Sequence, residues 1–582
     1  MNLYNEYKKL VKEKEYGKLK RAWFTTFTIS PDFIERYILP PLLNLDNEVP
    51  RTLSQFETIN VALDNSKIDI CFFYDAKMPL EGFKRTTVKL QGIYNNNGLF
   101  HPKVTLIEFE KKSFLMVGSA NLTLSGWGRN REAVTIKEIG EKQANQVTNF
   151  FKSFNIKTKE PKAINTNMKW DLIYKDLSKV LKNESNSLYV WSPYFSSELE
   201  STYKRFFPNY HIKIIPDKID GKIRLSKLPN IDKIEFFDDS FSRKDFMTHA
   251  KIWLTQNKIC IGSHNFTSAA LGNDNIEASI IDEVDSTTIN NLTKNLNVLE
   301  KPLLMTEEEL KENDLSDKNY FDLTVHLEAD WKNRTIRFYF LENEEKRLND
   351  FLPFTLYLPG GIEKKQTDRI HWKCKEYFLI LDKRGTEKTD KFFNALLSDR
   401  VFHIESKVNN ENKIITSAYI EEIGANINYR NPHKYTNLQD FFIDSLTDTI
   451  PENSNRIKII QDSDFELNIE EYINESRTFS YFEIFQIFMK QKERISKIPS
   501  GSVEFIHAVC YAPNSLKVLK SLLEDEMKNS SSIYSWFIID EFNSLLKNLK
   551  IKRAMISPIE QIKLNEKNKT FIDLASKIKG YK

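Results

Sequence analysis

Residues 101–121 read HPKVTLIEFEKKSFLMVGSAN, and residues 249–265 read HAKIWLTQNKICIGSHN. Each stretch opens on His-x-Lys and closes on Gly-Ser-x-Asn, with 17 residues between the lysine and the asparagine in the first copy and 13 in the second. Each is followed by Asn-x-Glu, which ends at Glu132 in one copy and at Glu277 in the other. A four-part pattern that occurs twice indicates an internal repeat of one structural unit.

The alternation of side chains along a strand brings the polar groups of each copy together. Residues i and i+2 face the same side, so His101 projects beside Lys103, and His249 projects beside Lys251. The next strand ends at Gly-Ser-x-Asn, where we expect glycine to permit a tight turn. Two such sets that face each other form a receptor for a tetrahedral phosphate. One imidazole can then attack phosphorus while the other protonates the leaving oxygen, and the lysines supply the positive charge that a metal ion supplies elsewhere.

Short strand-like runs surround both copies of the pattern. The first series lies within residues 68–136 and is followed by a helical stretch at 141–154, and the second series lies within residues 188–282. Strands that alternate with helical stretches predict an α/β fold. Near the N-terminus, residues 31–43 predict a helix that stops at its pair of prolines.

The pattern changes twice beyond the repeat. A charged stretch is followed by a strand-rich region with few helical patterns, which predicts a small β-sandwich, and the rest of the chain is mostly helical. The predicted organisation is a first lobe with N-terminal helices (1–155), a second lobe (156–305), a linker (306–319), a β-rich domain (320–428) and a mainly helical C-terminal domain (429–582).

Composition limits the class of protein. The 582 residues include 84 basic and 81 acidic ones, a net charge of +3, which excludes a globally basic binder but permits a local basic groove. The four cysteines form no CxxC pair, so neither a zinc site of the usual spacing nor a disulfide framework is expected. No apolar run approaches the roughly 18 residues of a membrane span, and the N-terminus lacks an apolar signal segment. We expect a cytoplasmic protein without membrane contact, metal or cofactor.

The doubled His-x-Lys, Gly-Ser-x-Asn and Glu pattern resembles the phospholipase D superfamily over residues 60–290. The resemblance implies two α/β lobes related by a pseudo-twofold axis, a site at their interface, and a two-step reaction through a covalent phosphohistidine. Many members carry aspartate five residues after each motif lysine, where this chain has Glu108 and Gln256. That departure, and Trp127 six residues after Asn121, are similar to the tyrosyl-DNA phosphodiesterases and to some bacterial nucleases of the superfamily.

The resemblance also implies a role for each motif residue. His101 is the expected nucleophile and His249 the general acid and later the base, and an exchange of these two roles stays open. Glu277 is expected to bond His101, and Glu132 to bond His249, which fixes the tautomer of each imidazole. The residues expected to hold the non-bridging phosphate oxygens are Lys103, Lys251, Asn121 and Asn265. The further candidates for substrate contact are Ser119, Ser263, Trp127 and His264, with a local structural role favoured for the two serines.

The expected function is metal-independent hydrolysis of DNA phosphodiesters, and a nuclease of bacterial restriction or defence is favoured. Three alternatives stay open: a 3′-end DNA repair phosphodiesterase, a phospholipase or phosphatidyl transferase, and a non-catalytic nucleic-acid binder. Nucleic acid is the expected partner, and the C-terminal domains are candidates for binding a protein partner or a dimer mate. The basic residues considered for contacts with a nucleic-acid backbone are Lys8, Lys9, Lys18, Lys20, Arg21, Lys550, Lys552 and Arg553.

Overall fold

The computed structural model divides the chain into two compact units. The first contains Met1–Val49 and Ile59–Arg430, and the second contains Pro50–Thr58 and Asn431–Lys582. The residues that the structure describes are 3–45, 49–50, 53–78, 80, 82–164, 168–182, 187–219, 221–239, 248–313, 321, 323–340, 347–373, 376–382, 386–397, 399–408, 411–425, 438–447, 480–511, 514–529, 533–561 and 573.

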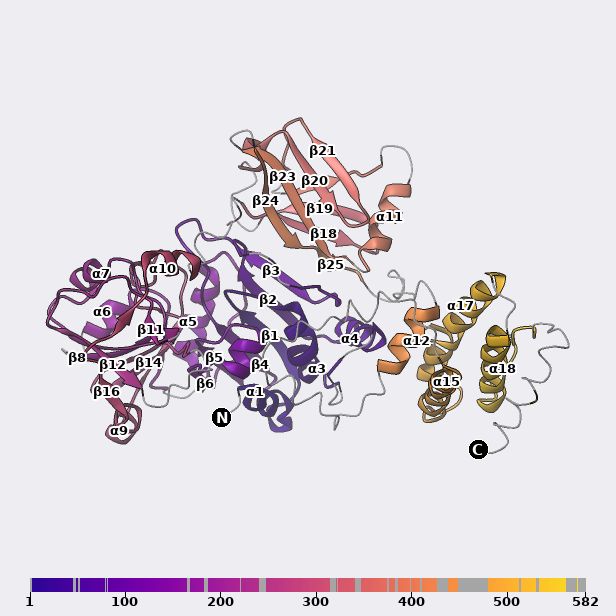
Figure 1. Cartoon of the computed structure of the whole chain (residues 1–582), viewed down its shortest axis with the longest axis horizontal. Coiled ribbons are helices and arrows are strands. Elements are labelled where there is room, and N and C mark those ends of the chain that lie inside the picture. Colours follow the sequence, from indigo (N-terminus) through magenta and orange to yellow (C-terminus); the bar gives the residue numbers. More distant parts are fainter. Residues whose placement is uncertain are drawn as a thin grey trace. The chain divides into compact units, whose positions relative to one another are not determined.

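A six-stranded sheet forms the body of the first lobe (Figure 1), with the strand order β3-β2-β1-β4-β5-β6. Strands β1, β2 and β3 pair in parallel, whereas β4, β5 and β6 follow as antiparallel strands. Its strands are β1 (Leu19–Thr25), β2 (Asp69–Asp75), β3 (Lys89–Ile93), β4 (Val104–Phe109), β5 (Ser113–Gly118) and β6 (Val134–Glu138). Its helices are α1 (Leu3–Lys12), η1 (Lys14–Tyr16), α2 (Pro31–Phe33), η2 (Ile34–Ile38), α3 (Leu39–Leu42), α4 (Leu53–Asn65), η3 (Ser125–Arg129) and α5 (Glu141–Lys152).

The first lobe differs from the prediction in two places. Strand β1 lies in the middle of the sheet but was not predicted, because its short run directly follows a charged helical stretch. The prediction that the helix over 31–43 stops at its prolines is wrong. After the π-helical turn η2, the short helix α3 takes Pro40 and Pro41 into its first turn. A missing N–H there breaks no helical hydrogen bond, so proline is tolerated.

The second lobe repeats this strand order within an eight-stranded sheet, β16-β12-β9-β8-β13-β14-β15-β7. The middle six strands correspond to β3-β2-β1-β4-β5-β6, with the same two parallel pairs followed by three antiparallel ones. Its strands are β7 (Asp171–Ile173), β8 (Ser187–Ser192), β9 (His211–Pro216), β10 (Lys218–Ile219), β11 (Lys222–Ile223), β12 (Ile234–Asp239), β13 (Ile252–Leu254), β14 (Lys258–Gly262), β15 (Ser279–Glu283), β16 (Leu296–Val298) and β17 (Leu303–Leu304). The helices are α6 (Leu177–Lys182), α7 (Leu199–Phe206), α8 (Ser268–Leu271), α9 (Ser286–Thr293) and, just beyond the lobe, α10 (Glu307–Asn313).

Buried apolar side chains join the two lobes. Ala278 and Ile280 of the second lobe lie in the same core cluster as Phe73 and Phe150 of the first. In the opposite direction, Ala133 packs into a second-lobe cluster. Burial of shared apolar surface holds the lobes together as one body, so groups at their interface keep a fixed geometry.

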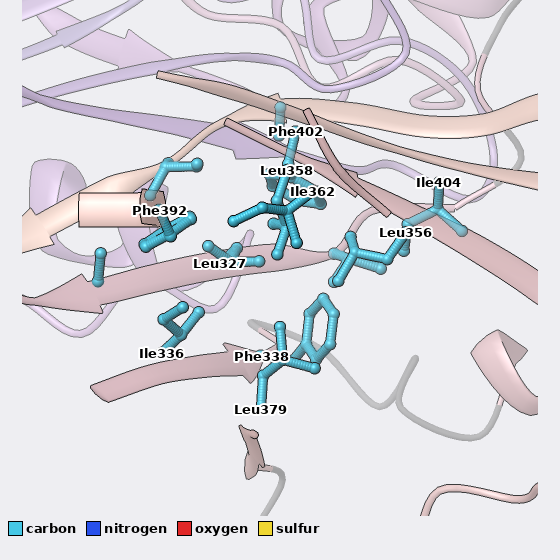
Figure 2. Close-up of a cluster of buried hydrophobic side chains, with 14 of the residues drawn as sticks. Leu327, Ile336, Phe338, Leu356, Leu358, Ile362, Leu379, Phe392, Phe402 and Ile404 are labelled. Carbon is cyan, nitrogen blue, oxygen red and sulfur yellow. The ribbon is translucent and has the colours of Figure 1, made fainter. Parts of the chain in front are cut away.

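The β-rich domain is a two-layered sandwich, as predicted. Its sheets have the orders β22-β19-β18-β25 and β21-β20-β23-β24, and one buried cluster takes side chains from both (Figure 2). Helix α11 adds Phe392 to this core. The elements are β18 (His326–Asp330), β19 (Thr335–Tyr339), η5 (Arg347–Phe351), β20 (Phe354–Leu358), β21 (Ile362–Gln366), β22 (Glu376–Leu379), α11 (Glu387–Ala395), β23 (Val401–Val408), β24 (Glu411–Tyr419) and β25 (Glu421–Ile423).

Buried polar contacts join this sandwich to the first lobe. Lys84, in the loop between β2 and β3, donates a 3.3 Å hydrogen bond to the carbonyl of Ile420. The carbonyl of Lys84 accepts from Arg400, whose Nε lies 2.7 Å from a carboxylate oxygen of Glu422. Lys84 is 3% exposed, and this burial lowers its pKa to about 8.

The second unit is helical in its described residues, as predicted for the end of the chain. Helix α15 begins with a capping box in which Ser480 and Glu483 bond each other's backbone N–H. A buried apolar cluster joins its helices. They are α12 (Leu438–Thr447), α15 (Tyr481–Ser496), α16 (Val503–Ile506), η6 (His507–Tyr511), α17 (Leu516–Asn529) and α18 (Ile533–Asn548).

Candidate active site

Two backbone bridges between the lobes bring the repeated motifs together. Phe100 pairs with Ile276, and Arg131 pairs with Thr248, each in the parallel sense. As a result, the backbone N–H of His101 donates to Ile276 at 2.9 Å, and that of His249 donates to Arg131 at 3.0 Å. Each motif histidine therefore lies next to the residue that precedes the glutamate of the other lobe.

The first histidine is held by a chain of polar groups from the second lobe. His101 Nδ1 lies 2.8 Å from Glu277 Oε2. Ser263 donates to the same carboxylate oxygen, and Asn275 Nδ2 donates to Oε1 at 3.2 Å. With Nδ1 bound to the carboxylate, Nε2 of His101 is the nitrogen left for chemistry.

The second histidine is held in the same way by the first lobe. His249 Nδ1 lies 3.0 Å from both carboxylate oxygens of Glu132. Ser119 donates to Glu132 Oε2, and Asn130 Nδ2 donates to Oε1 at 3.2 Å. The structure thus brings together the two His–Glu pairs that the sequence predicts, and it places both serines behind the glutamates.

Both motif lysines are buried at the same interface. Lys103 Nζ donates to the carbonyl of His101 at 2.7 Å, and Lys251 Nζ donates to that of His249 at 2.9 Å. Lys251 Nζ also lies 2.9 Å from His249 Nε2 and is 0% exposed. Burial lowers the pKa of Lys251 to about 7 and places the pKa of Lys103 well below its usual range.

Burial also sets the charge of the histidines and glutamates. It lowers the pKa of His101 and of His249 to about 4, although the adjacent glutamates act in the opposite direction. Burial alone would raise the pKa of Glu277, but His101 and other neighbours bring it down to about 2. At neutral pH both imidazoles are therefore neutral and Glu277 is ionised. With the proton of each imidazole on Nδ1, each Nε2 carries a lone pair that can attack phosphorus or accept a proton.

The motif asparagines occupy equivalent places with different partners. Asn121 Oδ1 accepts from the backbone N–H of Phe27 at 3.3 Å and from the hydroxyl of Thr26 at 3.4 Å. Asn265 Oδ1 is buried and has no hydrogen-bond partner among the residues that the structure describes. A buried amide without a full set of partners is suited to binding a polar ligand atom.

The motif glycines are required by close strand approach rather than by the expected tight turn. Gly118 and Gly262 are the last residues of β5 and β14 and pair with β6 and β15. A Cβ on Gly118 would lie 2.5 Å from the carbonyl oxygen of Ala133, and one on Gly262 would lie 2.3 Å from that of Ala278. Only glycine at the end of β5 and of β14 lets these strands approach β6 and β15 so closely.

Four supporting residues were not found from the sequence. The backbone N–H of Phe100, just before His101, donates to the Asp75 carboxylate at 2.7 Å. The backbone N–H of Thr248, just before His249, donates to the Asp217 carboxylate at 2.7 Å. The N–H groups that follow the motif asparagines donate at 3.0 Å to hydroxyl groups. Those hydroxyl groups belong to Thr26 and Ser192. For the aspartates a signal exists, since both follow an apolar run, in CFFYD and in KIIPD.

Two predicted substrate contacts lie inside packed surroundings. His264 is 1% exposed, and its Nδ1 lies 2.7 Å from the hydroxyl of Ser279. Trp127 is 6% exposed and packs edge-on against Tyr7 and Phe33, with ring centres 5.4 and 5.8 Å away. Trp127 also lines a cavity of about 890 Å³ between α1, η3 and β6, and this cavity reaches Glu132.

The N-terminal basic residues considered for nucleic-acid contacts are partly engaged in ion pairs. Lys20 pairs with Glu110 at 2.9 Å, and Arg21 pairs with Glu108 at 3.0 Å. Glu108 therefore binds a cation in the sheet rather than a motif lysine. Near the end of the chain, the three basic residues that were considered are exposed: Lys550, Lys552 and Arg553.

Neither a cluster of metal ligands nor a membrane-spanning helix occurs in the described part of the chain. It contains no group of three or more His, Cys, Asp or Glu side chains arranged to hold a metal ion. None of its helices combines the length and the apolar character needed to cross a bilayer.

Comparisons with known proteins give a family match to part of the chain and structural similarities at low TM-scores, of which two are described. The family described as cardiolipin synthase, PLD-like domain, matches residues 58–154. Polyphosphate kinase from Porphyromonas gingivalis is 9% identical at a TM-score of 0.32, and the alignment covers 50% of this chain but only 47% of the kinase. A mutant of yeast tyrosyl-DNA phosphodiesterase is 13% identical at a TM-score of 0.34, with 48% of this chain and 86% of that protein covered. No curated protein is a significant match to the sequence.

Proposed function

We propose that this protein, in which residues 58–154 form a phospholipase D-like domain, hydrolyses DNA phosphodiesters through a covalent phosphohistidine and acts as a nuclease. The observation that carries the proposal is the pair of His–Glu contacts across the two lobes, 2.8 Å for His101 and 3.0 Å for His249. Two neutral imidazoles that present Nε2 at one interface provide a nucleophile and a proton carrier for a single phosphate.

In the first step, His101 Nε2 attacks phosphorus while Glu277 accepts the hydrogen bond from Nδ1–H. The bond from phosphorus to the leaving oxygen breaks, and His249 gives its proton to that oxygen. In the second step, His249 takes a proton from water, which attacks phosphorus and releases His101. Each step transfers one proton, so the site returns to its starting state.

The lysines and asparagines stabilise the charge that develops on the non-bridging oxygens. Burial lowers the pKa of Lys103 and of Lys251, and a bound phosphodiester raises both again, so that both side chains are charged when substrate is present. A positive charge in a poorly hydrated site acts more strongly on an oxyanion than it does in water. The charge of the two lysines supplies what a divalent cation supplies in other phosphoryl-transfer sites, so activity is expected to resist EDTA.

Lys251 is also placed to supply the proton that His249 needs. Its Nζ lies 2.9 Å from His249 Nε2, and burial lowers its pKa to about 7. A bound phosphodiester adds a negative charge beside both groups, which raises the pKa of the imidazole. The proton that Lys251 shares with Nε2 then passes to the histidine and on to the leaving oxygen, and the proton that His249 takes from water in the second step returns to Lys251.

A second candidate function is phosphatidyl transfer. The observation in its favour is the description of the matching family, which names cardiolipin synthase. The same two-histidine chemistry serves it if an alcohol replaces water in the second step.

The test uses purified full-length protein with and without EDTA. Its substrates are end-labelled single-stranded DNA, duplex DNA, a 3′-phosphotyrosyl oligonucleotide and phospholipid vesicles. EDTA-resistant cleavage of DNA that is lost in His101→Ala is expected. Preference for the phosphotyrosyl substrate would make the protein an end-repair enzyme, activity only on vesicles would favour phosphatidyl transfer, and cleavage retained by His101→Ala would refute the mechanism.

A further inference from the structure

Arg224 lies beside the second-lobe half of the candidate site. It follows the short hairpin of β10 and β11, and its guanidinium carbon lies 4.4 Å from the centre of the Tyr194 ring. That ring in turn meets the His249 imidazole edge-on, with 6.2 Å between ring centres. The guanidinium group is therefore one aromatic ring away from the proposed acid.

The charge of Arg224 acts on groups of the site. Burial is the main reason that the pKa of Lys251 is lowered, and the positive charge of Arg224 acts in the same direction. Burial raises the pKa of Asp217, and Arg224 opposes that rise. Since Asp217 positions the backbone just before His249, Arg224 shares the electrostatic surroundings of the proposed acid.

One nitrogen of Arg224 lacks an acceptor. Its Nε is buried and has no hydrogen-bond partner among the described residues, while the side chain as a whole is half-buried. A buried N–H without an acceptor costs free energy, which an oxygen of a bound ligand would recover. The guanidinium fork matches the oxygens of a phosphate in particular.

The equivalent loop of the first lobe offers no comparable group. Between β2 and β3, Lys77 and Lys84 donate hydrogen bonds to backbone carbonyl groups. Arg85 forms an ion pair with Asp32 at 3.0 Å. Within the described residues of these two loops, a buried guanidinium nitrogen without a partner occurs only at Arg224, so the two loops differ in the hydrogen-bond donor that they offer to a ligand.

We infer that Arg224, held by Tyr194, binds a second phosphate of the DNA strand on the side of the leaving group. The inference rests on the proposed function, in which His249 protonates the leaving oxygen. The departing strand then starts at His249, and its next phosphate lies toward Arg224. A leaving alcohol without a phosphate gains nothing from this contact, so Arg224 makes the site selective for a polynucleotide.

Two matched oligonucleotides test this inference. The first ends in a 3′-(4-nitrophenyl) phosphate, whose leaving group carries no phosphate, and the second continues by two nucleotides in place of the nitrophenol. We expect Arg224→Ala to lower kcat/KM for the extended substrate about tenfold. The ratio of kcat/KM for the extended substrate to kcat/KM for the nitrophenyl substrate should fall at least about fivefold. For the extended substrate, the slope of log kcat/KM against log salt should become shallower by about one.

A matched control and two outcomes complete the experiment. Arg205, on α7, also lies over an aromatic ring, 4.8 Å from the centre of Phe206. Arg205→Ala should leave kcat/KM unchanged for both substrates. An Arg224→Ala ratio equal to that of the wild type would overturn the subsite. Wild-type protein that cleaves neither substrate would overturn the proposed function instead. Oligonucleotide binding followed by fluorescence anisotropy at several salt concentrations would still test Arg224, and an unchanged salt slope would overturn it.

Discussion

The first and second lobes build equivalent halves of one site from equivalent strands. Both have two parallel pairs followed by three antiparallel pairs. In both, the His-Lys pair directly precedes the first antiparallel strand, β4 or β13, and the glutamate contacts the histidine of the other lobe.

The loops that follow the corresponding strands β2 and β9 differ. The loop after β2 holds the β-rich domain through Lys84 and through the carbonyl of Gly82, which accepts a 3.1 Å hydrogen bond from Tyr419. The loop after β9 forms the hairpin that precedes Arg224. The comparison teaches that the chemistry constrains the strand ends, whereas the loops are free to acquire docking or recognition.

The largest effect should come from the two histidines, whose positions are equivalent but whose proposed roles are not. His101→Ala removes the nucleophile and should lower kcat about 10⁴-fold or more, with no protein–DNA adduct. His249→Asn keeps the nucleophile, so an adduct should accumulate. Denaturing gels of acid-quenched reactions with labelled DNA measure this, and an adduct on His101→Ala but not on His249→Asn would exchange the roles.

The next effect concerns the two glutamates. Glu277→Gln and Glu132→Gln should each lower kcat about 10- to 100-fold, because the amide no longer favours the N–H at Nδ1. Glu277→Gln should slow formation of the adduct. Glu132→Gln should slow both formation of the adduct and its hydrolysis, because His249 acts in both steps. Single-turnover kinetics separate the two steps. Equal effects of both variants on both steps would argue against distinct roles for the histidines.

The pH dependence distinguishes the nucleophile from the lysine beside the acid. His101 must be neutral, so kcat/KM should fall as pH drops through about 4. Lys251 must keep its proton, so kcat/KM should also fall as pH rises through about 7. Each limb should change about tenfold per pH unit. Lys251→Arg should lower kcat/KM, because guanidinium does not release the proton that His249 needs, and the remaining activity should lack the alkaline limb. An alkaline limb that persists at pH 7 would assign it to another group.

The smallest effect on turnover is expected from the docking contact of the first lobe. Arg400→Met leaves the buried Glu422 without its 2.7 Å partner, which should cost about 3–5 kcal/mol of stability. Turnover of the 4-nitrophenyl ester should stay within about twofold at a temperature well below unfolding. Thermal unfolding and initial rates measure the two effects. Loss of turnover without loss of stability would place the β-rich domain in catalysis.

The parts of the fold and the site that could be predicted are those marked in the sequence by the same residue types at similar spacings in both copies of the motif. The resemblance carried by the doubled motif implies the cross-lobe His–Glu pairs, and alternation predicts that each lysine accompanies its histidine. Alternation also accounts for His264, which lies between Ser263 and Asn265 and therefore points to the opposite side, where it meets Ser279. His264 was a candidate for substrate contact because it is next to motif residues in the chain, but its side chain points away from theirs.

The parts that the sequence did not predict depend on long-range contacts of common residues. Thr26 and Ser192 support the motif asparagines from strands distant in the chain, and nothing in their local sequence distinguishes them. Arg224 lies outside both motifs, and only folding brings it over Tyr194. Such residues become visible when the two lobes are compared position by position.

The cross-lobe bridges have a consequence for the ancestry of this chain. Because each histidine is completed by a glutamate from the other lobe, a polypeptide with one lobe could assemble this arrangement only as a symmetric dimer. In such a dimer every substitution appears twice. With both lobes in one chain that constraint is absent, so a residue such as Arg224 can occur on one side alone, and the phosphate contact proposed for it would give a pseudo-symmetric site a direction along its substrate.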